Sequence, residues 1–293
     1  MLSLRNVSKT YSVGAFGGGQ LNAVLDVSFD VHPGEVLSLI GESGSGKTTI
    51  GKMILRLTPI SAGTISYDGI DVSTLHRQPL KEYYRHVQGV FQDPFSSYNP
   101  IFKVDRIFSM IRSEFFPDVD VKTWGAKLDG ALEAVCLNPD DVLGKFPHQL
   151  SGGQLQRLLV ARALLLDIRY LVADEIISML DASTRIDVLN LLADLKQRGL
   201  GIVFITHDLS LGNYISDTTV ILRYGAIAEM GATAKVFGDP RHPYTQSLLA
   251  SVPHLHARWR LEDASHATNG SPQRPVKAAE LVPVDDDHLV AAQ

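Results

Sequence analysis

Residues 41–48 have the sequence Gly-Glu-Ser-Gly-Ser-Gly-Lys-Thr, and this segment is the most informative about the fold. It fits the pattern G-x-x-x-x-G-K-[ST] at every fixed position. The apolar run Val36–Ile40 before it is typical of a buried strand, and the stretch Thr49–Leu57 after it has a helical pattern. A strand, a glycine-rich loop and a helix in that order predict a loop that binds phosphate groups.

Each residue type in this loop has a chemical reason. Glycines let the backbone curl so that several N–H groups point at phosphate oxygens, and the helix N-terminus adds a favourable dipole. Lys47 reaches the β- and γ-phosphates in motifs of this kind, and Thr48 offers a hydroxyl to Mg²⁺. The motif predicts nucleotide binding but leaves a small-molecule kinase, a GTPase and a transport ATPase open.

A second acidic position follows the apolar run Tyr170–Ala173, where Asp174 and Glu175 stand side by side. Asp174 suits a Mg²⁺ ligand, directly or through water, and Glu175 suits a group that polarises an attacking water. The alternative at this point is an ordinary surface pair at a strand end.

Alternating strand and helix patterns predict an α/β fold with a parallel sheet. Gly201–Ile205 is a further buried strand, and apolar residues recur at helical spacing between Val188 and Leu195. Asp181 or Ser183 can cap the start of that helix. The N-terminal Met1–Val7 predicts an edge strand rather than a signal peptide.

Composition and charge exclude several classes of protein. The chain of 293 residues is 45% hydrophobic, which fits one large domain, or a domain with an appendage. Its net charge of -5 argues against a basic surface that coats nucleic acid. A single cysteine excludes a disulfide framework or a cysteine-built iron–sulfur centre within the chain. The longest apolar stretch, Leu158–Leu166, is too short to span a bilayer.

The order of several further motifs resembles that of ABC-type ATPase subunits. The phosphate loop is followed by Gln92, by Leu-Ser-Gly-Gly-Gln at 150–154, by Asp174-Glu175 and Leu180-Asp181, and by His207. The Leu-Ser-Gly-Gly-Gln element is the specific one, because other phosphate-loop proteins lack it. The chain departs from the family at Ile176, where a proline is usual; the catalytic carboxylates are kept.

The C-terminal part narrows the resemblance. Residues 238–245 read Gly-Asp-Pro-Arg-His-Pro-Tyr-Thr and look like the C-terminal signature of the ATP-binding subunits of oligopeptide, dipeptide and nickel importers. Residues 91–100 and 146–149 fit the same branch. In the segment 236–256, Tyr244, Leu248 and Leu249 form one apolar helical face, which we expect to dock on the main domain or on a partner.

The resemblance implies a phosphate-loop NTPase of the ABC ATPase fold, with a mostly parallel core sheet, an antiparallel β subdomain and a helical subdomain. The nucleotide-binding domain would span residues 1–235, with the helical subdomain at about 93–160. The transporter-type C-terminal segment would follow at 236–256. The rest, 257–293, is rich in Ala, Pro and Asp, and we expect it to be disordered.

The resemblance also implies a set of site residues. Glu175 and His207 would be catalytic, with His207 contacting the γ-phosphate. Mg²⁺ would be held by Thr48, Gln92 and Asp174. ATP would be bound by Tyr11, which stacks on adenine, and by Gly41, Glu42, Ser43, Gly44, Ser45, Gly46, Lys47, Thr48, Thr49 and Gln92. The nucleotide of a partner subunit would be contacted by Ser151, Gly152, Gly153, Gln154 and Asp181.

The implied function is ATP hydrolysis that energises a membrane importer, with oligopeptides or dipeptides as the first expectation for the cargo and oligosaccharide or nickel as alternatives. The implied partners are a second ATPase subunit, identical or paralogous, two transmembrane permease subunits and, indirectly, an extracytoplasmic solute-binding protein, with no nucleic acid. The chain would sit at the cytoplasmic face of the membrane. Alternatives of other classes are a soluble ABC ATPase that acts on DNA or ribosomes and a degenerate nucleotide-binding subunit.

Overall fold

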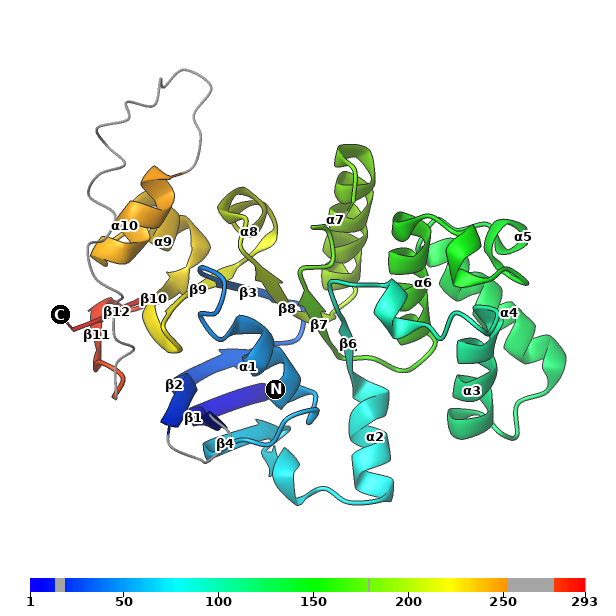
Figure 1. Ribbon diagram of the computed structural model, residues 1–293, viewed down its shortest axis with the longest axis horizontal. Helices are drawn as coiled ribbons and strands as arrows, with labels where there is room; N and C mark the ends of the chain where they lie inside the picture. Colours follow the sequence, from blue (N-terminus) through cyan, green and yellow to red (C-terminus); the bar gives the residue numbers. More distant parts are fainter. Residues whose placement is uncertain (14–18, 179, 252–276, 293) are drawn as a thin grey trace.

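The phosphate-loop strand lies in the middle of a large twisted sheet (Figure 1). The structure is a computed structural model that describes residues 1–13, 19–178, 180–251 and 277–292. The sheet has the strand order β11-β12-β10-β9-β3-β8-β7-β6. Its parallel part consists of β3 (Val36–Ile40), β6 (Val87–Val90), β7 (Tyr170–Asp174), β8 (Gly201–Thr206) and β9 (Thr218–Arg223).

The α/β fold with a mostly parallel core sheet is confirmed by this arrangement. All residues of β3, β7 and β8 are buried, which is why these strands read as continuous apolar runs rather than alternating ones. In the sheet, β8 lies between β3 and β7, and the three strands are parallel. The residues that follow their carboxyl ends therefore lie at the same edge of the sheet as the phosphate loop.

A second, antiparallel sheet packs on the other side of α1 (Lys47–Ile54). It has the order β2-β1-β4-β5 and consists of β1 (Leu2–Val13), β2 (Gly19–Val31), β4 (Ala62–Tyr67) and β5 (Ile70–Asp71). The expectation of an edge strand at Met1–Val7 is wrong, because β1 lies between β2 and β4. The apolar residues Leu2, Leu4 and Val7 indicate that β1 contributes to a core, but they do not report how many strands pair with its backbone.

Helices gather beyond the β6 edge of the large sheet (Figure 1). The short helix α2 (Gln78–His86) leads into β6, and three single turns, η1, η2 and η3, occupy Val72–Thr74, Phe95–Ser97 and Pro147–Gln149. The helical group consists of α3 (Asp105–Phe115), α4 (Val121–Ala134), α5 (Pro139–Val142) and α6 (Gly152–Leu164).

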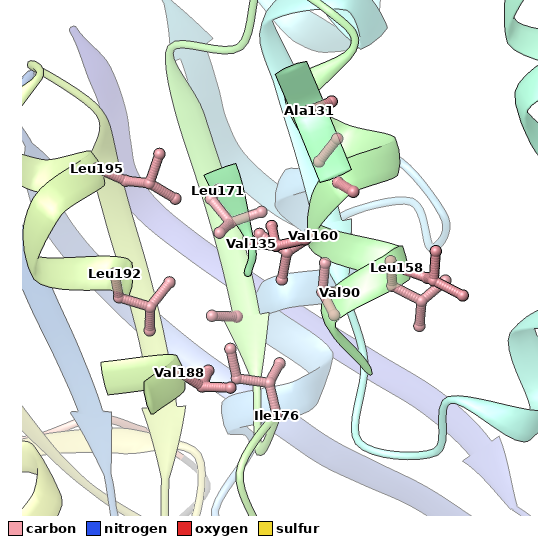
Figure 2. Close-up of a cluster of buried hydrophobic side chains, with 14 of the residues drawn as sticks. Val90, Ala131, Val135, Leu158, Val160, Leu171, Ile176, Val188, Leu192 and Leu195 are labelled. Carbon is pink, nitrogen blue, oxygen red and sulfur yellow. The ribbon is translucent and has the colours of Figure 1, made fainter. Parts of the chain in front are cut away.

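The largest core lies where α6 and α7 (Ala182–Gln197) cover one face of β7 (Figure 2). Val188, Leu192 and Leu195 project from one side of α7 toward this core, at the helical spacing expected from the sequence. Ile176, which stands where the family usually has proline, is 1% exposed and packs in the same cluster. The departure from the family pattern therefore fills core volume and leaves the neighbouring carboxylates in place.

The C-terminal part differs from the expected disordered tail. After α8 (Leu209–Ile215), β10 (Ala226–Ala232), α9 (Thr233–Gly238) and α10 (Pro243–Ala250), the chain forms a hairpin of β11 (Leu281–Asp285) and β12 (His288–Ala291). Strand β12 pairs antiparallel with β10, so the expectation is wrong for residues 277–292. Residues 257–276 lie outside the described residues.

Two features stabilise this hairpin that composition did not reveal. The acidic residues of the turn contact a cation, since Lys235 Nζ lies 2.8 Å from Asp285 Oδ1. His288, 2% exposed, places its Nε2 2.7 Å from Oε1 of the fully buried Glu229. An acidic, alanine-rich stretch can thus be ordered when its partner strand supplies the buried contacts.

Candidate active site

The phosphate loop joins β3 to α1 and approaches the antiparallel sheet closely. Gly46 has φ 104°, a left-handed conformation that favours glycine. A Cβ on Gly46 would lie 2.5 Å from the carbonyl oxygen of Ala23 in β2. The last glycine of the motif is therefore required by both the backbone angle and the neighbouring strand.

Lys47 lies folded within the loop and is only 5% exposed. Its ammonium donates to the carbonyl oxygens of Gly41 at 2.7 Å and Glu42 at 2.9 Å, and to the hydroxyl of Ser45 at 3.4 Å. Burial lowers the pKa of the Lys47 ammonium, and the carboxylates of Glu175, Asp174 and Glu42 partly offset that shift. The loop thus holds a desolvated cation next to its backbone N–H groups.

Asp174 ends β7 and lies beside the start of α1. Its Oδ1 accepts a hydrogen bond from Thr48 Oγ1 at 3.2 Å, and the residue is 3% exposed. Burial raises the pKa of the Asp174 carboxyl, and the hydrogen bond from Thr48 partly offsets it. A hydroxyl and a carboxylate at this separation are the hard oxygen donors that Mg²⁺ takes in nucleotide sites, so the residues fit the ion.

Glu175 and His207 meet across the ends of β7 and β8. Glu175 Oε1 lies 3.1 Å from His207 Nδ1. The backbone of Glu175 has φ 49°, a left-handed conformation that is uncommon for a residue with a side chain, and its N–H donates to the carbonyl oxygen of Ile205 at 2.9 Å. This turn directs the carboxylate away from the core toward the histidine, and such local strain clusters at functional sites.

Of these groups, Lys47, Thr48, Glu175 and His207 line one cleft with a volume of about 720 Å³, and Asp174 is not among its lining residues. Twelve residues line it: Tyr11, Leu21, Ala23, Ser43, Gly44, Gly46, Lys47, Thr48, Thr49, Gln92, Glu175 and His207. Ten of these twelve were expected from the sequence to bind nucleotide or to act in catalysis. The structure therefore brings the phosphate loop, Gln92 and the Glu175–His207 pair to one cavity.

Leu21 and Ala23 were missed by the sequence analysis. Tyr11 in β1 pairs with Leu21 in β2, so the two side chains belong to neighbouring strands at the mouth of the cleft. Lys9 Nζ lies 4.9 Å from the centre of the Tyr11 ring, which makes this wall aromatic and positively charged. The signal that could have identified Leu21 is antiparallel pairing, but the sequence alone does not fix which residue of β2 lies opposite Tyr11.

The second expected anion-binding element lies elsewhere. None of Ser151, Gly152, Gly153, Gln154 and Asp181 is among the described residues that line the cleft. Ser151 caps α6: its Oγ accepts from the N–H of Gln154 at 3.1 Å, and the Gln154 Oε1 accepts from the N–H of Ser151 at 2.9 Å. The N-terminus of α6 is therefore not part of the lining of this chain's own nucleotide cleft.

Asp181 has a structural role within this chain. It caps α7 and accepts hydrogen bonds from Ser183 Oγ, Thr184 N and Thr184 Oγ1. The hydrogen bond from the Ser183 hydroxyl, followed by those from Thr184, lowers the pKa of the Asp181 carboxyl. Asp181 therefore stays anionic near neutral pH and fixes the start of α7.

Along residues 1–13, 19–178, 180–251 and 277–292, the structure shows no helix with the length and apolar character needed to cross a membrane.

Comparison with known proteins gives a consistent result. The sequence profile described as "ABC transporter" matches residues 24–178, and that described as "Oligopeptide/dipeptide transporter, C-terminal region" matches residues 228–278. The second match covers α9 and α10. The first covers the phosphate loop, Gln92 and the carboxylates of Asp174 and Glu175.

The similar proteins include ATP-binding proteins that are named for peptide import. A putative peptide import ATP-binding protein of Brucella ovis is 41% identical over 260 residues, which cover 86% of this chain and 78% of that protein. The oligopeptide transport ATP-binding protein OppF of Streptococcus mutans is 41% identical over 261 residues, which cover 86% and 82%.

The fold is also similar to that of a solved ATP-binding cassette, MJ0796, in a dimeric post-hydrolysis state bound to ADP and Pi. The TM-score is 0.71 and the identity 26%, over 80% of this chain and 99% of the other. The residues that line the cleft, the matched profile and the similar sequences all indicate an ATP-binding protein of the ABC type. The chain belongs to the ABC transporter family of ATP-binding proteins, in the branch that carries the oligopeptide/dipeptide transporter C-terminal region.

Proposed function

We propose that this chain is the ATP-hydrolysing subunit of a membrane importer whose cargo is oligopeptides or dipeptides. The support for the cargo is the peptide-transport naming of relatives that are 41% identical over most of both chains. The support for ATP hydrolysis is a juxtaposition at one cleft: Lys47, Thr48 and the Glu175–His207 pair line it, and Asp174 accepts a hydrogen bond from Thr48. This juxtaposition is the observation that carries the proposal.

The proposed role of each group follows from its position. Lys47 exchanges its loop carbonyl partners for the β- and γ-phosphate oxygens of ATP, which are stronger acceptors because they are charged. Glu175 polarises the attacking water, and His207 orients that carboxylate and contacts the γ-phosphate. Tyr11 provides a flat apolar surface for the adenine ring at the cleft mouth.

Mg²⁺ completes the proposed site. Thr48 and Asp174 would hold it, with Gln92 at the same cleft wall as a further oxygen donor. The bound ion would neutralise negative charge on the β- and γ-phosphates. The hydroxyl of Thr48 donates to the Asp174 carboxylate, which holds these two oxygen donors side by side.

We also propose a composite site formed by two subunits. The N-terminus of α6 offers the Ser151 hydroxyl and the backbone N–H groups of Gly152 and Gly153 to the γ-phosphate bound to a partner. Gln154 and Asp181 hold the starts of α6 and α7 in this surface. ATP then joins the two subunits, and loss of the γ-phosphate removes contacts that favour the closed dimer. The partner is a second copy or a paralogous subunit.

A second cleft gives the permease subunits a place to dock. It has a volume of about 200 Å³ and is lined by apolar side chains that include Leu55, Leu57, Tyr84 and Phe91. Phe91 is the neighbour in sequence of Gln92, which lines the nucleotide cleft. A short amphipathic helix of a transmembrane subunit that binds in this cleft would contact Phe91, the residue directly before Gln92 of the nucleotide cleft.

The proposed organisation follows from these roles. Residues 1–235 form the nucleotide-binding domain, with a helical subdomain at about 93–160, and residues 236–256 form the transporter-type segment. The two permease subunits hold the chain at the cytoplasmic face of the membrane and connect it to a solute-binding protein on the other side.

Reconstitution tests the proposal. The chain is expressed with the permease and ATPase subunits encoded beside its gene, purified as a complex and placed in proteoliposomes with the cognate binding protein. We expect ATP hydrolysis and uptake of labelled peptide to rise together when a peptide mixture is added. Stimulation by oligosaccharide or Ni²⁺ instead would overturn the peptide cargo, and an absence of ATP hydrolysis in every condition would overturn the enzymatic role.

A further inference from the structure

The C-terminal segment reaches back to the phosphate loop through one side chain. Tyr244, in the first turn of α10, is 8% exposed, and its hydroxyl oxygen accepts a hydrogen bond from the backbone N–H of Glu42 at 3.2 Å. The ring packs in a cluster with Ile40, the last residue of β3 before the loop. The guanidinium of Arg223 lies 4.9 Å from the ring centre. The hydroxyl is therefore held in place by the packing of its ring.

The bonded N–H belongs to the peptide group between Gly41 and Glu42. The carbonyl oxygen of the same peptide group accepts from the Lys47 ammonium at 2.7 Å. Both polar atoms of this peptide group are thus hydrogen-bonded: its carbonyl oxygen accepts from Lys47, and its N–H donates to Tyr244. When Lys47 binds a phosphate group, its hydrogen bond to the Gly41 carbonyl oxygen weakens. The hydrogen bond from the Glu42 N–H to Tyr244 then remains to hold the peptide group in place.

A buried carboxylate fixes the start of α10. Glu229 of β10 is fully buried, and its two oxygens accept from the N–H groups of Arg241 at 2.8 Å and His242 at 3.0 Å. His242 Nδ1 in turn accepts from the N–H of Tyr244 at 3.0 Å. His288 in β12 also contacts the Glu229 carboxylate, so a second element of the C-terminal part holds this carboxylate in place. The position of Tyr244 is therefore set by the C-terminal segment rather than by the phosphate loop.

We propose that Tyr244 is a positioning residue for ATP binding, which holds the Gly41–Glu42 peptide in the conformation that receives the phosphates. The inference rests on the ATP-binding role proposed above. A loop that is already ordered loses less conformational entropy when ATP binds, so loss of the restraint weakens ATP binding. Tyr244 touches neither nucleotide nor water in this proposal, and hydrolysis of bound ATP proceeds at its usual rate.

The variant Tyr244→Phe removes the hydroxyl and keeps the ring in its apolar cluster. We expect ATP affinity, measured by titration with a fluorescent ATP analogue, to fall about threefold to tenfold, as loss of one neutral hydrogen bond implies. The KM for ATP should rise by the same factor with kcat unchanged. Hydrogen–deuterium exchange should accelerate in a peptide that spans residues 41–46, because the Glu42 N–H loses its acceptor.

The control is Tyr214→Phe, which removes the hydroxyl of an exposed tyrosine in α8. Tyr214→Phe should keep the wild-type melting temperature, and Tyr244→Phe should lower it by only about 2–4 °C, as loss of one hydrogen bond implies, which separates positioning from a general loss of stability. Unchanged affinity and unchanged exchange of the loop in Tyr244→Phe would overturn the inference. If the wild-type chain binds ATP but never hydrolyses it, the enzymatic proposal fails, while affinity and exchange still decide the role of Tyr244.

Discussion

His207 Nδ1 lies 3.1 Å from Oε1 of Glu175, at the ends of two neighbouring parallel strands. Asp174 is in register with Ile205, so the residues that follow are placed opposite one another by the sheet itself. The pairing requires Glu175 to adopt φ 49°, which costs about 1–3 kcal/mol for a residue with a side chain. The surrounding strands impose that conformation, and Glu175 lines the nucleotide cleft together with His207.

The first prediction concerns the Glu175 carboxylate. Glu175→Gln should lower the rate of ATP turnover by about 100-fold or more, because an amide of nearly the same shape does not act as a base toward water. ATP binding should persist, since Lys47, Thr48 and Asp174 are unchanged. With Mg²⁺ and ATP, the variant should elute as a dimer in size-exclusion chromatography.

The control is Glu133→Gln, an exposed glutamate of α4, which should hydrolyse ATP at the wild-type rate. Turnover by Glu175→Gln within twofold of wild type would remove Glu175 from its proposed role.

The second prediction concerns the buried ammonium of the loop. Lys47→Ala should weaken ATP binding by about 10- to 100-fold, because a charged hydrogen bond contributes about 1.5–3 kcal/mol. It also leaves the carbonyl oxygens of Gly41 and Glu42 without their donor. Isothermal titration with ATP measures the loss. Lys52→Ala, an exposed lysine of the same helix, is the matched control, and equal affinities of the two variants would contradict the assignment.

Three central strands and the phosphate loop could be predicted from the sequence because burial on both faces leaves unbroken apolar runs. Val36–Ile40 was predicted at its observed limits, and the other two runs end one residue short of β7 and β8. The order of the motifs also predicted most of the cleft, since the residues after parallel strands gather at one edge.

The parts that could not be predicted depend on tertiary partners. The second neighbour of β1 is β4, more than 50 residues away, and no local pattern in Met1–Val7 reports it. The hairpin β11–β12 carries Pro283 and an acidic turn, which are unfavourable in isolation but compatible with an edge position. Its order comes from pairing with β10 and from the buried contact of His288.

The third prediction tests the composite site. Ser151→Arg should bind ATP as a monomer with unchanged affinity and hydrolyse none, because the side chain that caps α6 would occupy the space of the partner's γ-phosphate. Ser113→Arg, on the exposed surface of α3, should be active. An equal mixture of Ser151→Arg and Lys47→Ala chains should recover about a quarter of the wild-type activity, since half of the dimers hold one intact site of two.

That recovery requires dimers of this chain. Complete absence of activity in the mixture, with both single variants folded, would mean that the sites are not composite or that the second subunit is a different chain. Repeating the mixture with the neighbouring ATPase subunit separates these two outcomes.

The fourth prediction concerns the attachment of the C-terminal hairpin. A Cβ on Gly231 in β10 would lie 2.2 Å from the carbonyl oxygen of Asp287, so Gly231→Ala should push β12 away from the sheet. The buried carboxylate of Glu229 would then lose its contact with His288, which should lower the free energy of unfolding by about 2 kcal/mol. Urea denaturation measures the change. Gly238→Ala is the matched control, since a Cβ there meets no atom within 4 Å; equal stability of the two variants would contradict the hairpin's role in closing this end of the sheet.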